Sequence, residues 1–545
     1  MENLSRELIV SSHATPIAEI GSLARVVEAE RAGRYVVAWQ EALKAIALRP
    51  FHPEAYIQMA STAVAAGDPE AALRAAQRAL ALTPKWPTAQ QVVTALERTL
   101  NDRRKQRKTA KLIAWPELPN PNRKPRLSVC MIVKNEERFL GQCLASVKDI
   151  ADELIVIDTG STDRTVEIAR EHGAQVGHFE WCDDFAAARN ASIAPATGDW
   201  ILSLDADEEL SLAEKQNLPA LLNRNNVALI RLPLNNTHLG QSSHGVVPRL
   251  FRNIPTIQFL GCVHEGVYTA LLKVSKEWQM EISLGDLLIL HHGNTPELTA
   301  ERNKVHRNYE LLVKALEKHP NHSCFHRYLG FELRRMDRLA ESFDAYAKAL
   351  NLAETQPNQI ITDEVRETLL TEYSGYLLAD KQYEKVLEVL TSDMALRQPL
   401  TPGQLLVRGR ALIHLRQPKY ALKDVQDAYS RREESTFFPS AIDPMGSGAE
   451  SLLAEALYLN GRHEEALPFF RSATQKSPND LRTILAFSEC LAADGRIEES
   501  LEYLNQQYLR LKQAPEIRVH LNNIKAKYGD KVCFADSTIA SIFGS

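Results

Sequence analysis

Cysteine and long apolar runs are both scarce in this sequence. Only seven cysteines occur among 545 residues, and no two of them have Cys-x-x-Cys spacing. This scarcity argues against a cysteine-based zinc site or a disulfide framework, and it favours a reducing compartment. No apolar stretch reaches the length of about 18 residues that a membrane span needs, and the first ten residues contain charged side chains. We therefore expect a cytoplasmic protein without a transmembrane segment.

Neither sign of charge dominates. Lys and Arg total 64 against 69 Asp and Glu, which gives a formal net charge of -5. Nucleic-acid binding requires a basic surface, so no nucleic-acid partner is expected. One local basic run, residues 103–111, is predicted to be a solvated helix end or linker. A surface for anionic lipid or acidic partners is the alternative for that run.

Small residues recur at a regular period in the first hundred residues. Between Ser22 and Thr99 two alanine-rich stretches repeat each other after about 34 residues. The residues Gly33, Ala42, Ala45 and Pro50 correspond to Gly67, Ala76, Ala79 and Pro84. This period is typical of helix pairs and resembles tetratricopeptide (TPR) repeats. Because two repeats cannot bury a solenoid core, we expect them to pack against another part of the chain.

Helical periodicity returns after about Pro296 and continues almost to the end. One copy contains Ala454, Leu457, Gly461, Glu465 and Phe470, and the next contains Ser488, Leu491, Gly495, Glu499 and Leu504. Residues 325–430 look like more degenerate copies. Such arrays form concave surfaces that suit peptides or partner proteins. The alternative is that these helices only brace the rest of the chain or mediate a homodimer.

Composition marks four segments along the chain. Prolines at positions 116, 119, 121 and 125 indicate an ordered or semi-rigid linker. We expect TPR-like helical repeats at 1–112, the linker at 113–126, an α/β domain at 127–295 and further TPR-like repeats at 296–545. The predicted fold class is thus an α/β domain flanked by all-α domains.

The α/β assignment rests on short apolar runs that alternate with helical segments. Runs 127–133, 154–157 and 200–204 have the composition of strands buried on both faces, and 139–147 and 163–172 that of helices. This alternation predicts a parallel sheet with functional residues at the carboxyl ends of the strands.

Four polar motifs follow one another through this domain. They are Lys134-Asn135-Glu136-Glu137, then Asp158-Thr159-Gly160-Ser161-Thr162-Asp163, then Trp181 with Asp183-Asp184-Phe185 and Ala188-Arg189-Asn190, and finally Asp205-Ala206-Asp207-Glu208-Glu209. Together, over residues 126–295, they resemble the family 2 glycosyltransferases of the GT-A (Rossmann-like) fold. The resemblance implies an enzyme that uses a nucleotide-sugar donor, typically a UDP-sugar, together with Mn²⁺ or Mg²⁺.

The paired carboxylates suit this chemistry. A divalent cation held by a carboxylate neutralises the charge that develops on a diphosphate leaving group. The resemblance implies that Asp207 ligates the metal, that Asp205 holds the ribose and that Asp158 binds the nucleotide base. It also places Glu136 near the ribose and makes Lys134 and Arg189 candidate donor contacts. Asp163 is expected to cap the helix that follows it, and Asn190 to be structural.

Inverting transfer also needs a base that deprotonates the acceptor. The candidate is Glu265, in Gly261-Cys262-Val263-His264-Glu265, with His264 as neighbour or alternative. A pair that only orients a loop is the competing interpretation. The resemblance to GT-A enzymes also implies a further metal ligand in His291-His292-Gly293, with His292 preferred and His291 as the alternative. A histidine of the core is the competing interpretation of either residue.

The string from Phe179 to Asn190, together with the flanking repeats, resembles SunS-type peptide glycosyltransferases. This implies transfer of a hexose or N-acetylhexosamine to a peptide or protein side chain. Two alternatives stay open: a saccharide or lipid acceptor of the cell envelope, and a repeat scaffold without catalysis. The sugar, the linkage and the oligomeric state are not determined by the sequence.

Overall fold

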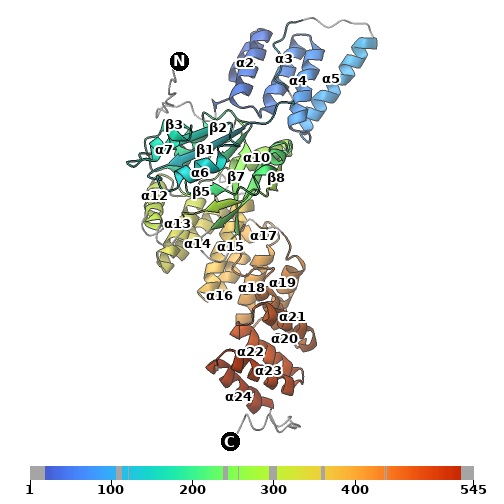
Figure 1. The fold of residues 1–545 in the computed structure, drawn as a ribbon. Coiled ribbons are helices and arrows are strands. Elements are labelled where there is room, and N and C mark those ends of the chain that lie inside the picture. Colours follow the sequence, from blue (N-terminus) through green and yellow to red (C-terminus); the bar gives the residue numbers. More distant parts are fainter. Residues whose placement is uncertain are drawn as a thin grey trace. The chain divides into compact units, whose positions relative to one another are not determined.

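The computed structural model describes residues 19–105, 113–120, 122–236, 244–255, 257–293, 303–356, 363–434, 436, 438–512 and 514–528. The chain forms two compact units, Met1–Lys318 and His319–Ser545 (Figure 1). Among the described residues, no helix has both the length and the apolar character that crossing a membrane requires.

The first unit begins with five helices that pack through small residues. They are α1 (Ala24–Arg31), α2 (Tyr35–Leu48), α3 (Pro53–Ala65), α4 (Pro69–Leu82) and α5 (Pro87–Lys105). Gly33 and Gly67, the equivalent glycines of the repeat, follow α1 and α3 with φ of 70° and 85°, a conformation that glycine adopts at helix ends. Asp68 then caps α4 by accepting a hydrogen bond from the Ala71 N–H. The period of the sequence therefore corresponds to successive helix pairs.

These helices pack against the β-sheet of the same unit. This was expected, because two repeats are too few to bury a core of their own. Arg49 is 1% exposed and donates from Nη1 to the Ala196 carbonyl, 3.0 Å away. The guanidinium of Arg252 lies over the rings of Phe51, at 4.5 Å, and Trp200, at 4.0 Å. One apolar core consequently joins the N-terminal helices to one face of the sheet.

The sheet of this unit is mixed. Its strands are β1 (Leu127–Val133), β2 (Glu153–Asp158), β3 (Gln175–His178), β4 (Trp200–Ser203), β5 (Glu208–Leu210), β6 (Val227–Asn236), β7 (His244–Arg252), β8 (Glu281–Leu284) and β9 (Ile289–His291). The strand order is β3-β2-β1-β4-β7-β6-β9-β5, with β8 also paired to β6. β1 to β4 are parallel, as predicted, whereas β7 runs antiparallel to both β4 and β6. The antiparallel half was not predicted from the sequence.

Helices cover both faces of the sheet. They are α6 (Leu140–Val147), α7 (Thr165–Glu171), α8 (Phe185–Ile193), α9 (Leu218–Leu222) and α10 (Tyr268–Trp278), and α12 (Lys304–Lys318) ends the unit. Alternate residues of β1 enter different cores: Cys130 packs with α8, α10 and the N-terminal helices, while Val129 and Met131 pack with α6, α7 and α9. This period-two burial on both faces explains the continuous apolar run of the strand.

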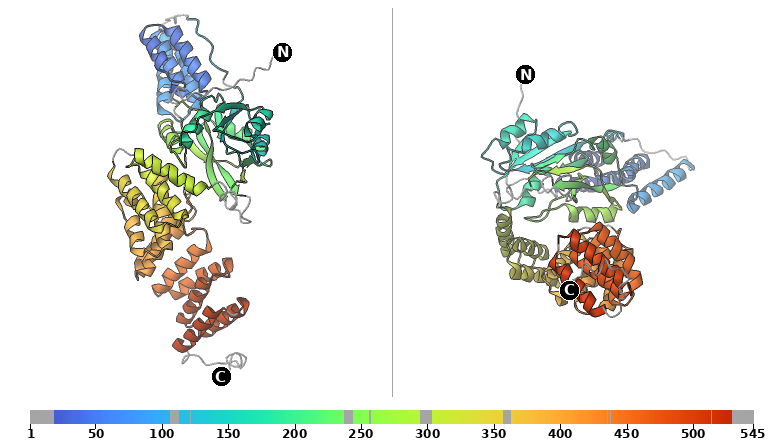
Figure 2. Two further views of the ribbon diagram at one scale, coloured as in Figure 1. Left: turned by 90° about the vertical axis from the view of Figure 1, so that its left-hand side faces the viewer. Right: turned by 60° about the horizontal axis from the view of Figure 1, so that its bottom comes forward.

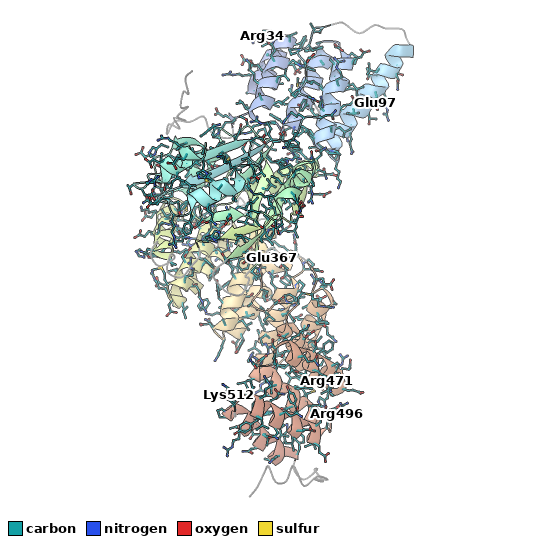
Figure 3. The ribbon with its side chains drawn as sticks, viewed as in Figure 1. Arg34, Glu97, Glu367, Arg471, Arg496 and Lys512 are labelled. Carbon is teal, nitrogen blue, oxygen red and sulfur yellow. The ribbon has the colours of Figure 1, made fainter. Side chains whose placement is uncertain are left out.

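In the second unit the secondary structure of the described residues is helical, as predicted, and the helices follow one another as stacked pairs (Figure 2). They are α13 (Ser323–Arg335), α14 (Leu339–Thr355), α15 (Asp363–Ala379), α16 (Tyr383–Leu390), α17 (Asp393–Leu396), α18 (Pro402–His414), α19 (Pro418–Ser430), α20 (Ser447–Leu459), α21 (His463–Lys476), α22 (Leu481–Ala493), α23 (Ile497–Arg510) and α24 (Pro515–Tyr528). Gly461 and Gly495 end α20 and α22 with positive φ. Arg471 and Arg496, at the surface of this array, both approach Glu499 (Figure 3).

Acid is expected to destabilise the N-terminal repeats through His52. Its Nε2 lies 2.8 Å from the Gly21 carbonyl oxygen and its Nδ1 accepts from the Ala55 N–H, so the neutral imidazole fits the site. Burial lowers the pKa of His52 from 6.5 to about 4, and the Gly21 contact only partly opposes this. The unfolded chain therefore binds a proton that the folded chain does not, and stability falls by up to about 3 kcal/mol between about pH 6.5 and pH 4.

Thermal unfolding followed by tryptophan fluorescence, at several values of pH in this window, measures the effect. His52→Gln should flatten the dependence. An equally steep loss in His52→Gln would show that another group is responsible.

Candidate active site

The site is built where three parallel strands end. Val133 of β1 is in register with Asp158 of β2, and Cys130 of β1 with Ser203 of β4. Asp158 is buried, and its carboxylate accepts hydrogen bonds from the N–H groups of Gly160 at 3.1 Å and Ser161 at 3.0 Å. Gly160 has a φ of 103°, which an L side chain would strain. The turn after β2 thus holds this carboxylate at the strand end.

The loops after β1 and β2 are bound to each other. The Asn135 side-chain oxygen accepts from the Thr162 N–H at 2.8 Å, and the Glu136 N–H donates to the Thr165 hydroxyl at 2.8 Å. Asp163 accepts from the Thr165 N–H at 3.0 Å, at the start of α7, although the N-cap position, which was predicted for Asp163, belongs to Arg164. Lys134 is exposed and Glu136 half-buried beside this junction. Their donor contacts stay predictions.

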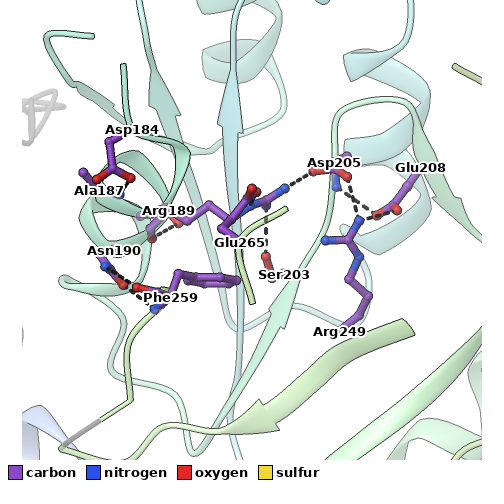
Figure 4. Close-up of polar contacts among 11 residues, drawn as sticks. Asp184, Ala187, Arg189, Asn190, Ser203, Asp205, Glu208, Arg249, Phe259 and Glu265 are labelled. Carbon is purple, nitrogen blue, oxygen red and sulfur yellow. Dashed lines mark hydrogen bonds and ion pairs between the residues drawn. The ribbon is translucent and has the colours of Figure 1, made fainter. Parts of the chain in front are cut away.

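Asp205 lies between two arginines (Figure 4). Its Oδ1 accepts from Nη2 of Arg189 at 2.5 Å, and its Oδ2 accepts from Nη2 of Arg249 at 2.6 Å. Arg249 also donates to Glu208 at 2.6 Å, and the other carboxylate oxygen of Glu208 accepts from the Asp205 N–H at 2.9 Å. Arg189 comes from α8 and Arg249 from β7, so distant segments fix the conformation of Asp205.

Burial and ion pairing oppose each other in this network. Burial alone would raise the pKa of Asp205, but Arg189 and Arg249 together hold it well below its ordinary value. The pKa of Glu208 is raised, mainly by burial. The negative charge of Asp205 adds to this effect, and Arg249 only partly opposes it. The pKa values of both arginines lie above their ordinary value despite burial, because the neighbouring carboxylates favour the cations. Asp205 is therefore a fixed anion at neutral pH.

Arg189 also reaches the predicted base. Its Nε donates to Oε1 of Glu265 at 2.5 Å, and the side chains of Arg189 and Glu265 are 8% and 12% exposed. His264 is exposed, with a φ of 54° that turns the chain just before Glu265. Asn190, on the same helix as Arg189, binds the backbone of Phe259 through both its amide oxygen and nitrogen, as its expected structural role requires. The structure thus brings Arg189, Asp205 and Glu265 together.

Asp207 faces a histidine of β9. Its Oδ1 lies 3.6 Å from Nε2 of His291, whose Nδ1 lies 2.9 Å from the side-chain oxygen of Asn236. His292, the preferred candidate from the sequence, instead places Nε2 2.9 Å from Glu209. Neighbouring residues of a strand point to opposite faces, so His291 and His292 take different partners. Asp207 lies in the turn before β5 and is not part of the register Glu208↔His291.

Gly293 packs directly on Asp207. A Cβ atom added at Gly293 would lie 1.7 Å from Oδ2 and 2.5 Å from Cγ of Asp207. Only a residue without a side chain leaves the Asp207 carboxylate in its place. Within the part of the chain that the structure describes, no group of three or more His, Cys, Asp or Glu residues could hold a metal ion. Among the described residues, Asp207 and His291 are two side chains with atoms of the kind that bind metal ions, 3.6 Å apart.

Sequence reasoning missed Arg249, Glu208 and Gly293 as site residues. Glu208 and Gly293 lie inside the quoted motifs, next to residues that were singled out. Arg249 lies in Pro248-Arg249-Leu250-Phe251-Arg252, which gives no sign of the strand or the carboxylate with which it pairs.

Two protein-family models match parts of this chain. The family model described as glycosyl transferase family 2 matches residues 128–257, and a tetratricopeptide repeat model matches residues 448–520. A TPR repeat-containing protein of Synechococcus elongatus is 42% identical over 208 residues, which are 38% of this chain and 51% of that protein. The SPbeta prophage-derived glycosyltransferase SunS of Bacillus subtilis is 28% identical over 232 residues, 42% of this chain and 54% of that protein.

The chain thus spans about half the length of these curated relatives. Among solved structures, glucosyl-3-phosphoglycerate synthase from Mycobacterium tuberculosis in complex with Mn²⁺, UDP and glucosyl-3-phosphoglycerate is 20% identical, covers 35% of this chain and 79% of its own, and gives a TM-score of 0.27. These matches confirm the resemblance of the central domain to family 2 glycosyltransferases and that of the C-terminal repeats to tetratricopeptide repeats. The protein therefore carries a family 2 glycosyltransferase domain followed by tetratricopeptide repeats.

Proposed function

We propose that this chain is a metal-dependent inverting glycosyltransferase that moves a hexose or N-acetylhexosamine from a UDP-sugar to a peptide or protein side chain. The observation that carries the proposal is the placement of Asp205 and Asp207. Both follow β4, at the same strand ends as Asp158, and each has a defined partner. Such paired carboxylates at the carboxyl edge of an α/β sheet suit a diphosphate donor.

The residues present fit a divalent cation. Asp207 offers a carboxylate oxygen and His291 an imidazole nitrogen, 3.6 Å apart, and the contact of His291 with Asn236 fixes the orientation of its ring. We assign His291, in preference to His292, as the second ligand. Bound Mn²⁺ or Mg²⁺ would neutralise the diphosphate as it leaves. Two protein ligands leave coordination positions for diphosphate oxygens.

The remaining residues take roles in donor binding. The carboxylate of Asp158, held by two backbone N–H groups, presents an acceptor for an N–H of the nucleotide base. Asp205 is kept ionised by its two arginines and would accept hydrogen bonds from ribose hydroxyls. Arg189 is buried between Asp205 and Glu265, so we assign it to positioning both carboxylates rather than to contact with the diphosphate.

Glu265 is the proposed base. Its contact with Arg189 holds the side chain in one orientation, and a carboxylate so placed can accept a proton from an attacking hydroxyl or thiol. His264 stands beside it on the exposed side of the turn. The peptide acceptor is supported by the helical repeats, whose surfaces suit polypeptides, and by the similarity to SunS.

Donor turnover tests the proposal. The purified chain is incubated with a panel of nucleotide sugars and Mn²⁺ or Mg²⁺, and the released nucleoside diphosphate is quantified. We expect metal-dependent release from one UDP-sugar, and a decrease of about 10²–10³-fold in Asp207→Asn, because charge stabilisation of the leaving group is lost. Asp149→Asn, an exposed acid that pairs with Lys215, is the matched control and should be unaffected.

Addition of candidate peptides should increase the release if a polypeptide is the acceptor, and envelope saccharides or lipids should not. Failure of every nucleotide sugar to bind or turn over, or equal release by Asp207→Asn, would contradict the proposal.

A further inference from the structure

A second cavity, separate from the site above, lies between the N-terminal helices and the catalytic domain of the first unit. Its volume is about 400 Å³, and its charged lining comprises Arg78, Arg123, Arg126, Arg252 and Asp199. Arg126 and Asp199 directly precede β1 and β4, whereas the proposed donor site follows the carboxyl ends of these strands. The cavity is therefore at the opposite edge of the sheet.

The arginines of this cavity outnumber the carboxylates that they contact. Asp199 receives both terminal nitrogens of Arg123, at 2.7 and 2.5 Å, and Glu153 lies 3.0 Å from Arg126. Arg78 donates to the Pro119 carbonyl at 2.7 Å, and Arg252 to the Arg224 and Val227 carbonyls. Within the described residues, neither Arg78 nor Arg252 forms an ion pair with a carboxylate.

Arg252 is the more unusual of the two, because it is 4% exposed. Burial lowers its pKa to about 9, and the charge of Asp199 only partly offsets this. Arg49 lies where the same N-terminal helices meet the sheet. It is also buried, beside the Ala196 carbonyl, and burial lowers its pKa to about 10. Buried cations in proteins are normally paired with an anion, because leaving them unpaired is costly. The contact between the N-terminal helices and the sheet thus contains, next to the cavity, buried arginines without a carboxylate partner among the described residues.

We propose that this cavity binds a small molecule through a phosphate group, held by Arg78 and Arg252. Guanidinium groups bind phosphate oxygens through charge-assisted hydrogen bonds, and Arg78 and Arg252 both line this volume. The volume falls in the range of small-ligand sites, about 300–1,000 Å³. The site is distinct from the proposed donor site and does not depend on the proposed function.

Binding at this position links two parts of the unit. Arg78 belongs to α4 of the N-terminal helices, and Arg252 ends β7 of the catalytic domain. A phosphate bound by both arginines would connect the helices to the sheet through hydrogen bonds. A ligand that binds only the folded state raises the unfolding temperature.

Calorimetric titration of the full chain tests the site, with inorganic pyrophosphate and adenosine monophosphate as separate probes and EDTA present to remove divalent metal. We expect binding and a raised unfolding temperature in the wild-type chain. Arg78→Gln should bind about tenfold more weakly, since one charge-assisted hydrogen bond is lost. Arg74→Gln, on the exposed side of α4 one turn earlier, is the matched control and should bind normally.

The two probes separate the sources of the phosphate: tighter binding of pyrophosphate indicates an inorganic ligand, and tighter binding of the nucleotide an organic one. Asp207→Asn should bind both as the wild type does, because the proposed donor site is not involved. Absence of binding to the wild-type chain, equal affinity in Arg78→Gln, or loss of binding in Asp207→Asn would each overturn the proposal.

Discussion

Replacing Arg189 with methionine is expected to lower the free energy of unfolding of the first unit by about 3–5 kcal/mol, the range measured when one partner of a buried ion pair is removed. The methionine side chain fills a similar space but leaves Glu265 without its recorded cation and Asp205 with Arg249 alone. Both carboxylates lie close to one another around the lost guanidinium, so their charges also repel. Urea unfolding at pH 7.5, followed by tryptophan fluorescence, measures the loss.

The difference between the wild type and Arg189→Met should become smaller as the pH falls. In the wild type the folded-state pKa of Asp205 lies below its unfolded value, so its contribution to stability is present above that value and is lost on acidification. In the variant the folded-state pKa of Asp205 is higher than in the wild type, because Arg189 no longer opposes the effect of burial, and protonation then removes the charge of this carboxyl. Both effects reduce the difference in free energy of unfolding between the wild type and Arg189→Met at low pH.

Arg189→Lys is the informative companion variant. Lysine keeps the positive charge but cannot bind two carboxylates through a rigid fork, so we expect an intermediate loss of stability. If Arg189→Met unfolds at the same urea concentration as the wild type, or if the difference between them is independent of pH, the assignment of Arg189 as the residue that positions Asp205 and Glu265 is wrong.

The parallel half of the sheet could be predicted because its signals are local. Each of β1, β2 and β4 is a short apolar run that ends in a polar motif, and strands of this kind are buried on both faces. Parallel order then places Asp158 and Asp205 at one edge of the sheet without further information. The repeats were equally readable, since Gly461 and Gly495 recur at the same helix boundary.

The antiparallel half depends on pairings that the sequence does not encode locally. β7 lies between β4 and β6, and β5, although it follows β4 in sequence, pairs with β9 some 80 residues later. Arg249 reaches Asp205 only because β7 occupies that position in the strand order. Likewise, the contact of Asp207 with His291 rather than His292 depends on the turn before β5 and on the pairing of β5 with β9, and the local sequence encodes neither.

Gly293→Ala is expected to have the second large effect, on the proposed metal site. The added methyl group would lie 1.7 Å from a carboxylate oxygen of Asp207, so either Asp207 or the strand end after His291 must move. A misplacement of about 1 Å at a catalytic centre costs about 10²-fold in rate, and we expect a loss of that size in kcat/KM for donor turnover. Binding of Mn²⁺, measured by calorimetry without a donor, should weaken in parallel.

Gly245→Ala provides the matched control for this substitution. A Cβ atom at Gly245, on β7, would meet nothing within 4 Å, so the same chemical change should leave both turnover and Mn²⁺ binding unchanged. The free energy of unfolding of Gly293→Ala should fall by only about 1–3 kcal/mol, the cost of overpacking. A small loss of stability together with a large loss of activity would show that the carboxylate is displaced in a domain that is still folded. A folded Gly293→Ala protein with wild-type affinity for Mn²⁺ would show that the Asp207 carboxylate is not a metal ligand in the position described.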